Sequence, residues 1–447
     1  MAFSVALALL PARSWGHTVL VKDIRPGDLS SFPGGFGEFS RKAFFQADDG
    51  VNGRELWISD GTAAGTTLLK DIKRGIGGSN PIGFTRFDGK VFFSADDGVH
   101  GRELWKSDGT AAGTKLVKDI NRGMGDSDAG PFSFTRYNGR LFFAADDGVH
   151  GVELWKSDGR ARGTKLVKDI HPGRRGSGLE FSDMLNVNGQ LFFAADAGVH
   201  GKELWKSDGT AAGTRLVKDI NFGVGASDPS GLTAFKGKLF FAAYDHAHSI
   251  QPWKSDGTAR GTKLVKDING SHGSGPFGFT RSNGRLFFAA DDGVHGGELW
   301  SSDGSASGTN LVKDIYSGSR GSGPSNLTMF KSKLFFTALD GVPGGGLWRS
   351  DGSASGTKLV RHVSAWGEAG FAKAGGKLFF AAFDAVHGGQ LWKSDGSTAG
   401  TKLVKGISPA GGNSEAPHGL TSVNGKVFFS ADDGVHGSEL WMSDGNP

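Results

Sequence analysis

The feature that most constrains this chain is a repeat of roughly fifty residues. The tripeptide Glu-Leu-Trp, or a close variant, recurs nine times, and successive Trp residues lie 44 to 50 positions apart. These residues are Trp57, Trp105, Trp155, Trp205, Trp253, Trp300, Trp348, Trp392 and Trp441. Self-similarity at this period indicates one supersecondary unit copied in tandem, in which each copy buries its hydrophobic face against its neighbours. We therefore expect the Trp side chains to pack between copies.

Each copy contains four short strand candidates. In the third copy they cover 132–137, 141–145, 153–157 and 164–170. Side chains alternate along a strand, so Leu141 and Phe143 should point to one side and Phe142 to the other. Asn138-Gly139 between the first two strands is a typical hairpin turn. Four strands in a unit of this length is typical of a β-propeller blade rather than of a helical solenoid.

The two ends of the sequence predict a closed ring. Segment 18–24 has the pattern of a fourth strand with no first three before it, and segment 439–441 that of a third strand with no fourth after it. Pairing these segments would complete the ninth unit and remove exposed sheet edge. We therefore predict an all-β, nine-bladed β-propeller with four-stranded blades, in which the N-terminal strand completes the last blade. One domain covers 17–447.

Two copies carry a specific motif. Segments 103–120 (ELWKSDGTAAGTKLVKDI) and 203–220 (ELWKSDGTAAGTRLVKDI) resemble the ELWxxDGT repeat family, whose members are mostly bacterial. The resemblance covers nearly the whole chain beyond residue 16 and implies a propeller fold and export. It supplies no catalytic residue. Copies five, seven and eight depart from the motif and should lack the role of its Glu, since they have Gln251, Gly346 and Gln390 in its place.

The start of the chain and its composition bear on location. Residues 1–16 contain an apolar run without a basic segment before it, which we interpret as a weak signal-like leader or a disordered arm. There is no Cys, which excludes disulfides, thiolate nucleophiles and zinc-thiolate sites. No apolar stretch is long enough for a transmembrane segment. We expect a monomer located outside the cell or on its surface.

The charges are dispersed along the sequence. The net charge is +4 and the pI is about 9.0, but no run of Lys and Arg stands out. Nucleic-acid-binding proteins usually show a basic stripe or patch, so we do not expect a nucleic-acid partner. Lys recurs in the fourth strands, for example Lys118 and Lys168, and we interpret it as protection of an outer sheet edge.

The loop between the second and third strands contains the best candidate site. In the third copy it reads Asp146-Asp147-Gly148-Val149-His150, with Glu153 following. The equivalent candidate ligand-binding residues are Asp97, His100, Asp147, His150, His200, Asp292, His295, Asp433 and His436. In a propeller these loops share a face with the long, variable links between copies, where binding usually occurs.

Three interpretations of these loops remain open. The Asp-Gly pairs can be turn structure alone, the Asp and His side chains can contact a ligand, or Asp and Glu oxygens can bind Ca²⁺. We expect no other cofactor.

A second candidate lies on the inner strands. Arg86, Arg136 and Arg281 occupy one aligned position and are similar to the arginine clamp of sialidases. No Tyr with an acidic partner occurs near them, so a polar, water-lined channel explains them as well.

These observations favour an exported, non-catalytic binding or interaction module for carbohydrate or another cell-surface polymer, because repeated sites gain from multivalency. A glycan-cleaving hydrolase similar to sialidases is the alternative, but it needs a unique pair of carboxylates within reach of each other. The carboxylates here are repeated rather than unique, and we assign no catalytic residue. A structural spacer in a surface protein is the third hypothesis.

Overall fold

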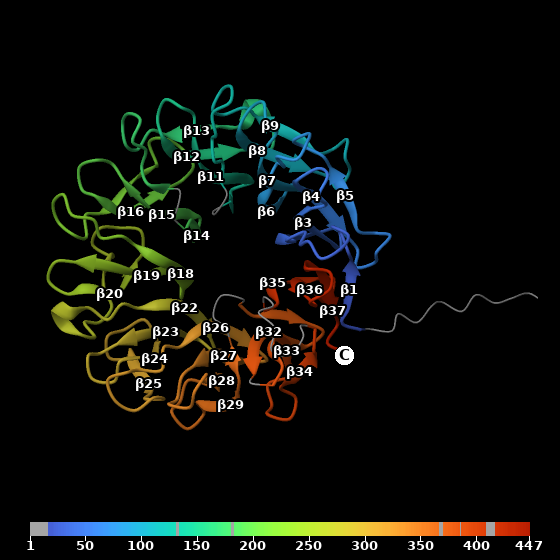
Figure 1. Cartoon of the computed structure of the whole chain (residues 1–447). Coiled ribbons are helices and arrows are strands. Elements are labelled where there is room, and N and C mark those ends of the chain that lie inside the picture. The colour runs from blue at the N-terminus through green and yellow to red at the C-terminus, as the bar shows by residue number, and fades with distance from the viewer. Residues whose placement is uncertain (1–16, 131–133, 180–182, 366–369, 385, 408–415) are drawn as a thin grey trace, which may run out of the picture.

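The computed structural model describes residues 17–130, 134–179, 183–365, 370–384, 386–407 and 416–447. Nine antiparallel sheets stand around a common centre as the blades of a ring (Figure 1). The predicted nine-bladed propeller is confirmed. The predicted leader or arm, 1–16, lies outside the described residues.

In blades one to eight the strands follow one another in chain order from the centre of the ring to its rim, and in blade nine β1 takes the place at the rim (Figure 1). The first strands are β2 (Gly34–Phe39), β6 (Ile82–Phe87), β10 (Thr135–Tyr137), β14 (Leu185–Val187), β18 (Ser230–Phe235), β22 (Phe277–Ser282), β26 (Ser325–Phe330), β31 (Ala372–Ala374) and β35 (His418–Val423). The second strands are β3 (Lys42–Asp48), β7 (Lys90–Asp96), β11 (Arg140–Asp146), β15 (Gln190–Asp196), β19 (Lys238–Asp245), β23 (Arg285–Asp291), β27 (Lys333–Ala338), β32 (Lys377–Asp384) and β36 (Lys426–Asp432).

The third strands are β4 (Arg54–Ser59), β8 (Arg102–Ser107), β12 (Val152–Ser157), β16 (Lys202–Ser207), β20 (Ser249–Ser255), β24 (Gly297–Ser302), β28 (Gly346–Ser350), β33 (Gly388–Ser394) and β37 (Ser438–Ser443). The fourth strands are β5 (Thr67–Lys70), β9 (Lys115–Lys118), β13 (Lys165–Lys168), β17 (Arg215–Lys218), β21 (Lys263–Leu264), β25 (Asn310–Lys313), β29 (Lys358–His362), β34 (Lys402–Lys405) and, in blade nine, β1 (Val19–Lys22). A short strand β30 (Ser364–Ala365) also pairs with β32, and two 3-10 turns are η1 (Ala161–Gly163) and η3 (Gly270–His272).

The ring closes through the ends of the described chain. β1 pairs with β37, with Val19 opposite Met442. Beside this pair, Thr18 Oγ1 lies 2.8 Å from Ser443 Oγ. The same Ser–Thr contact joins the third and fourth strands inside other blades, as between Ser157 and Thr164. Closure by the N-terminal strand is therefore confirmed, although this strand is shorter than the predicted segment 18–24.

The hydrophobic core lies between blades. Trp205 of blade four packs in one cluster with Tyr137 and Phe142 of blade three, and the nine Trp side chains are only 4% to 7% exposed. Phe143 faces the opposite side, where it packs with Phe92 of blade two. Burying a side chain of this size contributes roughly 2–3 kcal/mol or more. The predicted packing role of the Trp residues and the alternation along the second strand are both confirmed.

The Lys residues of the fourth strands connect neighbouring blades. Lys118 Nζ donates to the backbone oxygen of Thr164 at 2.8 Å and lies 5.3 Å from the ring centroid of Trp155. Equivalent bonds to the next blade are made by Lys22, Lys70, Lys168, Lys218, Lys266, Lys313, Arg361 and Lys405. Our interpretation of these residues as edge protection was therefore incomplete, because each bonds the adjacent blade.

Candidate functional site

The molecule has two faces of different construction. The link face contains the loops between second and third strands and the links from each fourth strand to the next blade, because both lie at the same strand ends. The backbone hydrogen bond from Asp96 N to Ser79 O, 3.0 Å, joins such a loop to such a link. The turn face, at the opposite end of the strands, contains the hairpin turns between first and second strands and between third and fourth strands.

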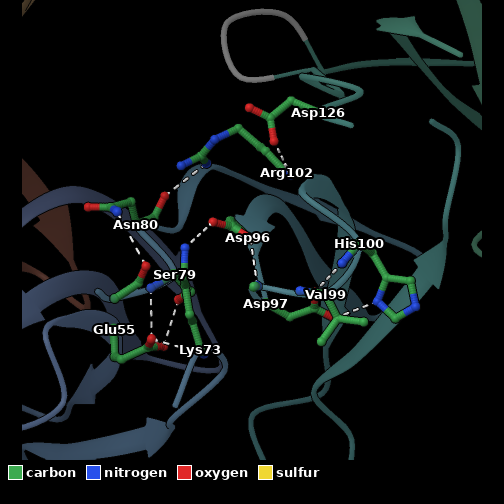
Figure 2. A network of polar contacts seen from close by, with 12 residues as sticks. Glu55, Lys73, Ser79, Asn80, Asp96, Asp97, Val99, His100, Arg102 and Asp126 are labelled. Atoms are coloured by element: carbon green, nitrogen blue, oxygen red, sulfur yellow. Dashed lines mark hydrogen bonds and ion pairs between the residues drawn. The ribbon is translucent and has the colours of Figure 1, made fainter. Parts of the chain in front are cut away.

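On the link face, each predicted Asp is engaged by its own loop. Asp97 Oδ1 accepts hydrogen bonds from the backbone N–H groups of Val99 and His100, at 2.9 and 2.8 Å, and Asp97 Oδ2 lies 2.8 Å from His100 Nδ1 (Figure 2). The same arrangement recurs in the pairs Asp147–His150, Asp292–His295 and Asp433–His436. Both carboxylate oxygens of these Asp residues therefore hold the turn, as the first interpretation expects.

These contacts shift the pKa of both partners. The hydrogen bond to Asp97 raises the pKa of His100 above its usual value. Burial acts to raise the pKa of Asp97, but the hydrogen bonds from the side chain and backbone of His100 outweigh it, and the pKa is lowered. The pairs therefore favour a charged His beside an ionised Asp over a wider pH range than isolated residues would.

His200 shows what happens without this Asp. Ala197 stands at the Asp position of blade four, and His200 Nδ1 instead lies 2.9 Å from Oδ2 of Asp219, in the following link. The structure therefore brings this predicted residue to the link rather than to its own loop.

In the six blades whose third strand has the Glu, its side chain is buried rather than presented on the face. Glu103 has no exposed surface and accepts hydrogen bonds from Asn121 N at 2.9 Å and Ser127 Oγ at 2.7 Å. Glu55 binds Lys73 N and Ser79 in the same way (Figure 2). Burial raises the pKa of Glu103 to about 7, against the opposing effect of these donors. The Glu that follows the loop, which we considered as a possible Ca²⁺ ligand, is thus buried and fastens the link instead.

Blades five and eight keep this fastening with Gln. Gln251 Oε1 accepts from Ser274 Oγ at 2.7 Å, and its Nε2 donates to Asp267 Oδ1 at 3.0 Å. Gln390 Oε1 accepts from Ile407 N at 2.7 Å. Our expectation that these two copies lack the role of the Glu is therefore wrong.

No group of three His, Asp or Glu side chains comes together as a metal site among the residues that the structure describes. A buried Glu and an Asp of the following link influence each other without a third acidic side chain or His completing a metal site among the described residues. In blade two, Asp119 Oδ1 is buried without a hydrogen-bond partner, and its charge acts to raise the pKa of Glu103.

Sequence reasoning missed the apolar side chains that the link face exposes. Val99 and Val149 at the loop tips are 62% and 60% exposed, and Ile76 and Phe222 in the links are 87% and 94% exposed. The Gly residues around them in the sequence could have predicted this exposure, because Gly-rich turns lie at the surface and offer no hydrophobic core to bury such side chains. Valines in the same position are exposed in blades one, four, six and nine, at Val51, Val199, Val294 and Val435.

The three Arg residues of the inner strands are exposed, and none forms an ion pair with another described residue. Arg86 lies 5.8 Å from the ring centroid of Phe39. Arg281 borders a hollow of about 440 Å³ together with Met329 and Lys373, which occupy the aligned position in the next two blades. The structure therefore places the aligned position on the inner wall of the ring.

Neither a family model nor a curated protein sequence matches the chain. Among solved structures, it is similar to the computationally designed Ika8 protein, with 13% identity, a TM-score of 0.45, and coverage of 94% of this chain and 97% of that one. One of two prolyl endopeptidases is matched over 83% of this chain, with 13% identity and a TM-score of 0.43. A puromycin hydrolase mutant is matched over 89%, with 12% identity and a TM-score of 0.43. The chain spans 54% and 58% of the length of these two enzymes.

Among the described residues, no helix is long and apolar enough to cross a membrane.

Proposed function

We propose that this protein is an exported, non-catalytic binding module that recognises a repeating carbohydrate or another cell-surface polymer through its link face. One observation carries the proposal: the same pair of an exposed Val and a half-exposed His recurs on the loops of five blades. These pairs are Val99–His100, Val149–His150, Val199–His200, Val294–His295 and Val435–His436.

The chemistry of each pair suits a sugar unit. Nδ1 of His100 is held by Asp97, and Nε2 makes no hydrogen bond to a described residue, so Nε2 is available to a hydroxyl group. The adjacent Val99 offers an apolar contact for the C–H groups of a sugar ring. Single contacts of this kind are weak, but a polymer that reaches several blades gains from effective concentration.

Saturation binding to a glycan array, with and without Ca²⁺, tests this proposal. We expect binding that increases with the length of the polymer and that persists without Ca²⁺, because the Asp oxygens are engaged within their own loops. Binding that requires Ca²⁺ would instead support the metal interpretation of the loops. Absence of binding to every glycan would overturn the carbohydrate proposal.

A variant in which His100, His150 and His200 are replaced by Gln identifies the surface. The variant should lose at least part of the affinity for the polymer while its melting temperature stays close to that of the parent, since the three imidazoles lie at the surface. Hydrolysis of a glycan that is abolished by replacing Arg86, Arg136 or Arg281 would favour the enzyme hypothesis instead.

A further inference from the structure

The turn face carries two rings of basic residues. The first ring is the first residue of the second strand, which is Lys or Arg in eight of the nine blades. Its members are Lys42, Lys90, Arg140, Lys238, Arg285, Lys333, Lys377 and Lys426. Every second strand begins on the turn face. The eight basic residues therefore all lie on this face.

The second ring is the first residue of the fourth strand. It is basic and exposed in six blades, at Lys115, Lys165, Arg215, Lys263, Lys358 and Lys402. Six further exposed basic residues lie in the turns, at Arg41, Arg160, Arg162, Lys236, Arg260 and Lys331. The turn face thus has twenty basic residues. It also has ten Asp residues, namely Asp60, Asp88, Asp108, Asp158, Asp208, Asp256, Asp303, Asp351, Asp395 and Asp444.

The ten Asp residues offset about half of this positive charge, but few of the cations are held in direct contacts. The Asp residues mostly hold their own turns, as Asp108 Oδ1 does by accepting from the N–H and hydroxyl groups of Thr110. Arg140–Asp158, at 2.9 Å, is the one ion pair between described residues of this face. None of the six cations in the second ring forms an ion pair or hydrogen bond with a described residue, so they remain available to a partner.

The link face has the opposite charge. The ends of the second strands and the loops after them contribute fourteen Asp residues, and the described links add twelve more, for example Asp119 and Asp219. The Lys and Arg residues at the starts of the third strands and in the described links are fewer, namely Arg54, Arg102, Lys202, Arg25, Lys73, Arg74, Arg122, Arg174, Arg175 and Arg320. The fourteen Asp residues of the strand ends and loops are Asp48, Asp49, Asp96, Asp97, Asp146, Asp147, Asp196, Asp245, Asp291, Asp292, Asp340, Asp384, Asp432 and Asp433. The small net charge of the chain therefore conceals one basic and one acidic face.

We infer that the turn face is a docking surface for an acidic polysaccharide, a polymer with carboxylate or sulfate groups on successive sugar units. This inference goes beyond the proposed function, because it concerns the opposite face and a different ligand charge. A broad basic surface attracts a polyanion and accelerates its association. Cations repeated from blade to blade let one chain make several contacts at once.

The side chains of this face favour a polysaccharide over a nucleic acid. Proteins that bind single-stranded nucleic acids without sequence preference stack bases on exposed aromatic rings. The exposed large hydrophobic residues of the described chain, including Phe32, Phe222 and Phe277, all lie outside the turn face. A carboxylated or sulfated sugar chain needs only the cations and hydroxyl groups that the turns provide.

Two variants of equal charge change test the inference. The turn-face variant replaces Lys115, Lys165, Lys263 and Lys358 by Gln. The control variant replaces Arg74, Arg122, Arg174 and Arg175 by Gln, four exposed cations in the links of the opposite face. All eight side chains are exposed, so both variants should fold and melt as the parent does. The probe is labelled polygalacturonate, with dextran as the uncharged polymer, and binding is followed by fluorescence anisotropy.

The parent should bind polygalacturonate but not dextran, with an affinity that falls as NaCl is raised. The turn-face variant should bind roughly tenfold more weakly or worse, since several exposed ionic contacts are lost together, and the control should stay within about twofold of the parent. Equal weakening in both variants, or no binding by the parent, would overturn the inference. So would stronger competition by single-stranded DNA of equal charge.

A second copy of the chain could also occupy the turn face, and sedimentation of the parent at low salt tests this alternative. If the basic face of one copy binds the acidic face of another, the parent will sediment as larger species and both variants will reduce them, which would also overturn the inference. The variant of His100, His150 and His200 should bind polygalacturonate as the parent does. A failure of the link-face proposal is therefore distinguishable from a failure of this one.

Discussion

Blades two and five attach the following link to the third strand through different groups, and we call this attachment the joint. In blade two a buried carboxyl group, Glu103, holds the following link, and Asp119 Oδ1 lies nearby without a hydrogen-bond partner. In blade five Gln251 holds the equivalent link, and its amide N–H satisfies Asp267 Oδ1. The difference indicates that the joint requires a hydrogen-bond acceptor rather than a negative charge.

The largest effect of a single substitution is expected where the joint spans the closure of the ring. Glu439 accepts hydrogen bonds from Ile24 N at 2.9 Å, Ser31 N at 3.0 Å and Ser31 Oγ at 2.6 Å. Glu439→Leu leaves these buried donors without acceptors and should reduce the free energy of unfolding by about 3–5 kcal/mol. Urea denaturation measures this change. A loss below that of the same substitution in blade two would show that closure depends on β1 pairing alone.

The same substitution inside the ring should cost less. Glu103→Leu removes the acceptor for Asn121 N and Ser127 Oγ, and we expect a loss of about 2–4 kcal/mol. Glu103→Gln is the matched control, because blade five already uses this residue, and it should stay within about 1 kcal/mol of the parent. Equal losses in the two variants, measured by urea denaturation at pH 5, where Glu103 is mainly neutral in the folded protein, would contradict the comparison.

The reverse exchange in blade five sharpens the comparison. Gln251→Glu replaces the N–H that binds Asp267 Oδ1 by an acidic oxygen, and it also leaves the carbonyl oxygens of His248 and Gly270 without this donor. We expect a loss of about 1–3 kcal/mol at pH 8 and a smaller one at pH 5, where the new carboxyl group is protonated more easily. A loss independent of pH would argue against charge repulsion.

The parent should become less stable as the pH rises from about 5 to 8. Burial raises the folded-state pKa of Glu103, Glu153 and Glu439 to about 7 from the ordinary value of 4.5. Their contribution is therefore complete below 4.5 and is lost as the pH rises towards and through 7, up to about 3 kcal/mol each. Melting temperatures across this range measure the effect, and replacing all three by Gln should flatten the profile.

We expect the smallest change in stability from a substitution that makes the loop of blade two resemble that of blade four. Asp97→Ala reproduces the Ala197 of blade four, where His200 pairs with Asp219 instead. Loss of the turn hydrogen bonds should cost about 1 kcal/mol, as at a capping residue. NMR titration of His100 should then show a pKa lower than in the parent but still under the influence of Asp119, which already acts on it. An unchanged titration would show that Asp97 does not govern this His.

Much of the fold was predictable because the signals are local and repeated. The nine Glu-Leu-Trp variants gave the number of blades, and the Asn138-Gly139 turn and alternation around Phe142 gave the hairpins. Strand ends were less predictable: the fourth strand of blade three ends at Lys168 rather than at residue 170. Of the candidate site, the Asp97–His100 turn followed from spacing. The burial of Glu103 did not, because its partners Asn121 and Ser127 belong to the next link.

By itself, the sequence determined the β-propeller, its nine blades and its closure by the segment that contains β1, because each depends on short patterns that recur along the chain. The tertiary structure alone decided where the charges lie. Lys90 and Asp96 are the first and last residues of one strand. In the sequence they lie close together, so their opposite charges show no separation. The strand separates them onto opposite faces, and its repetition around the ring turns a chain without a basic run into a molecule with one basic and one acidic face.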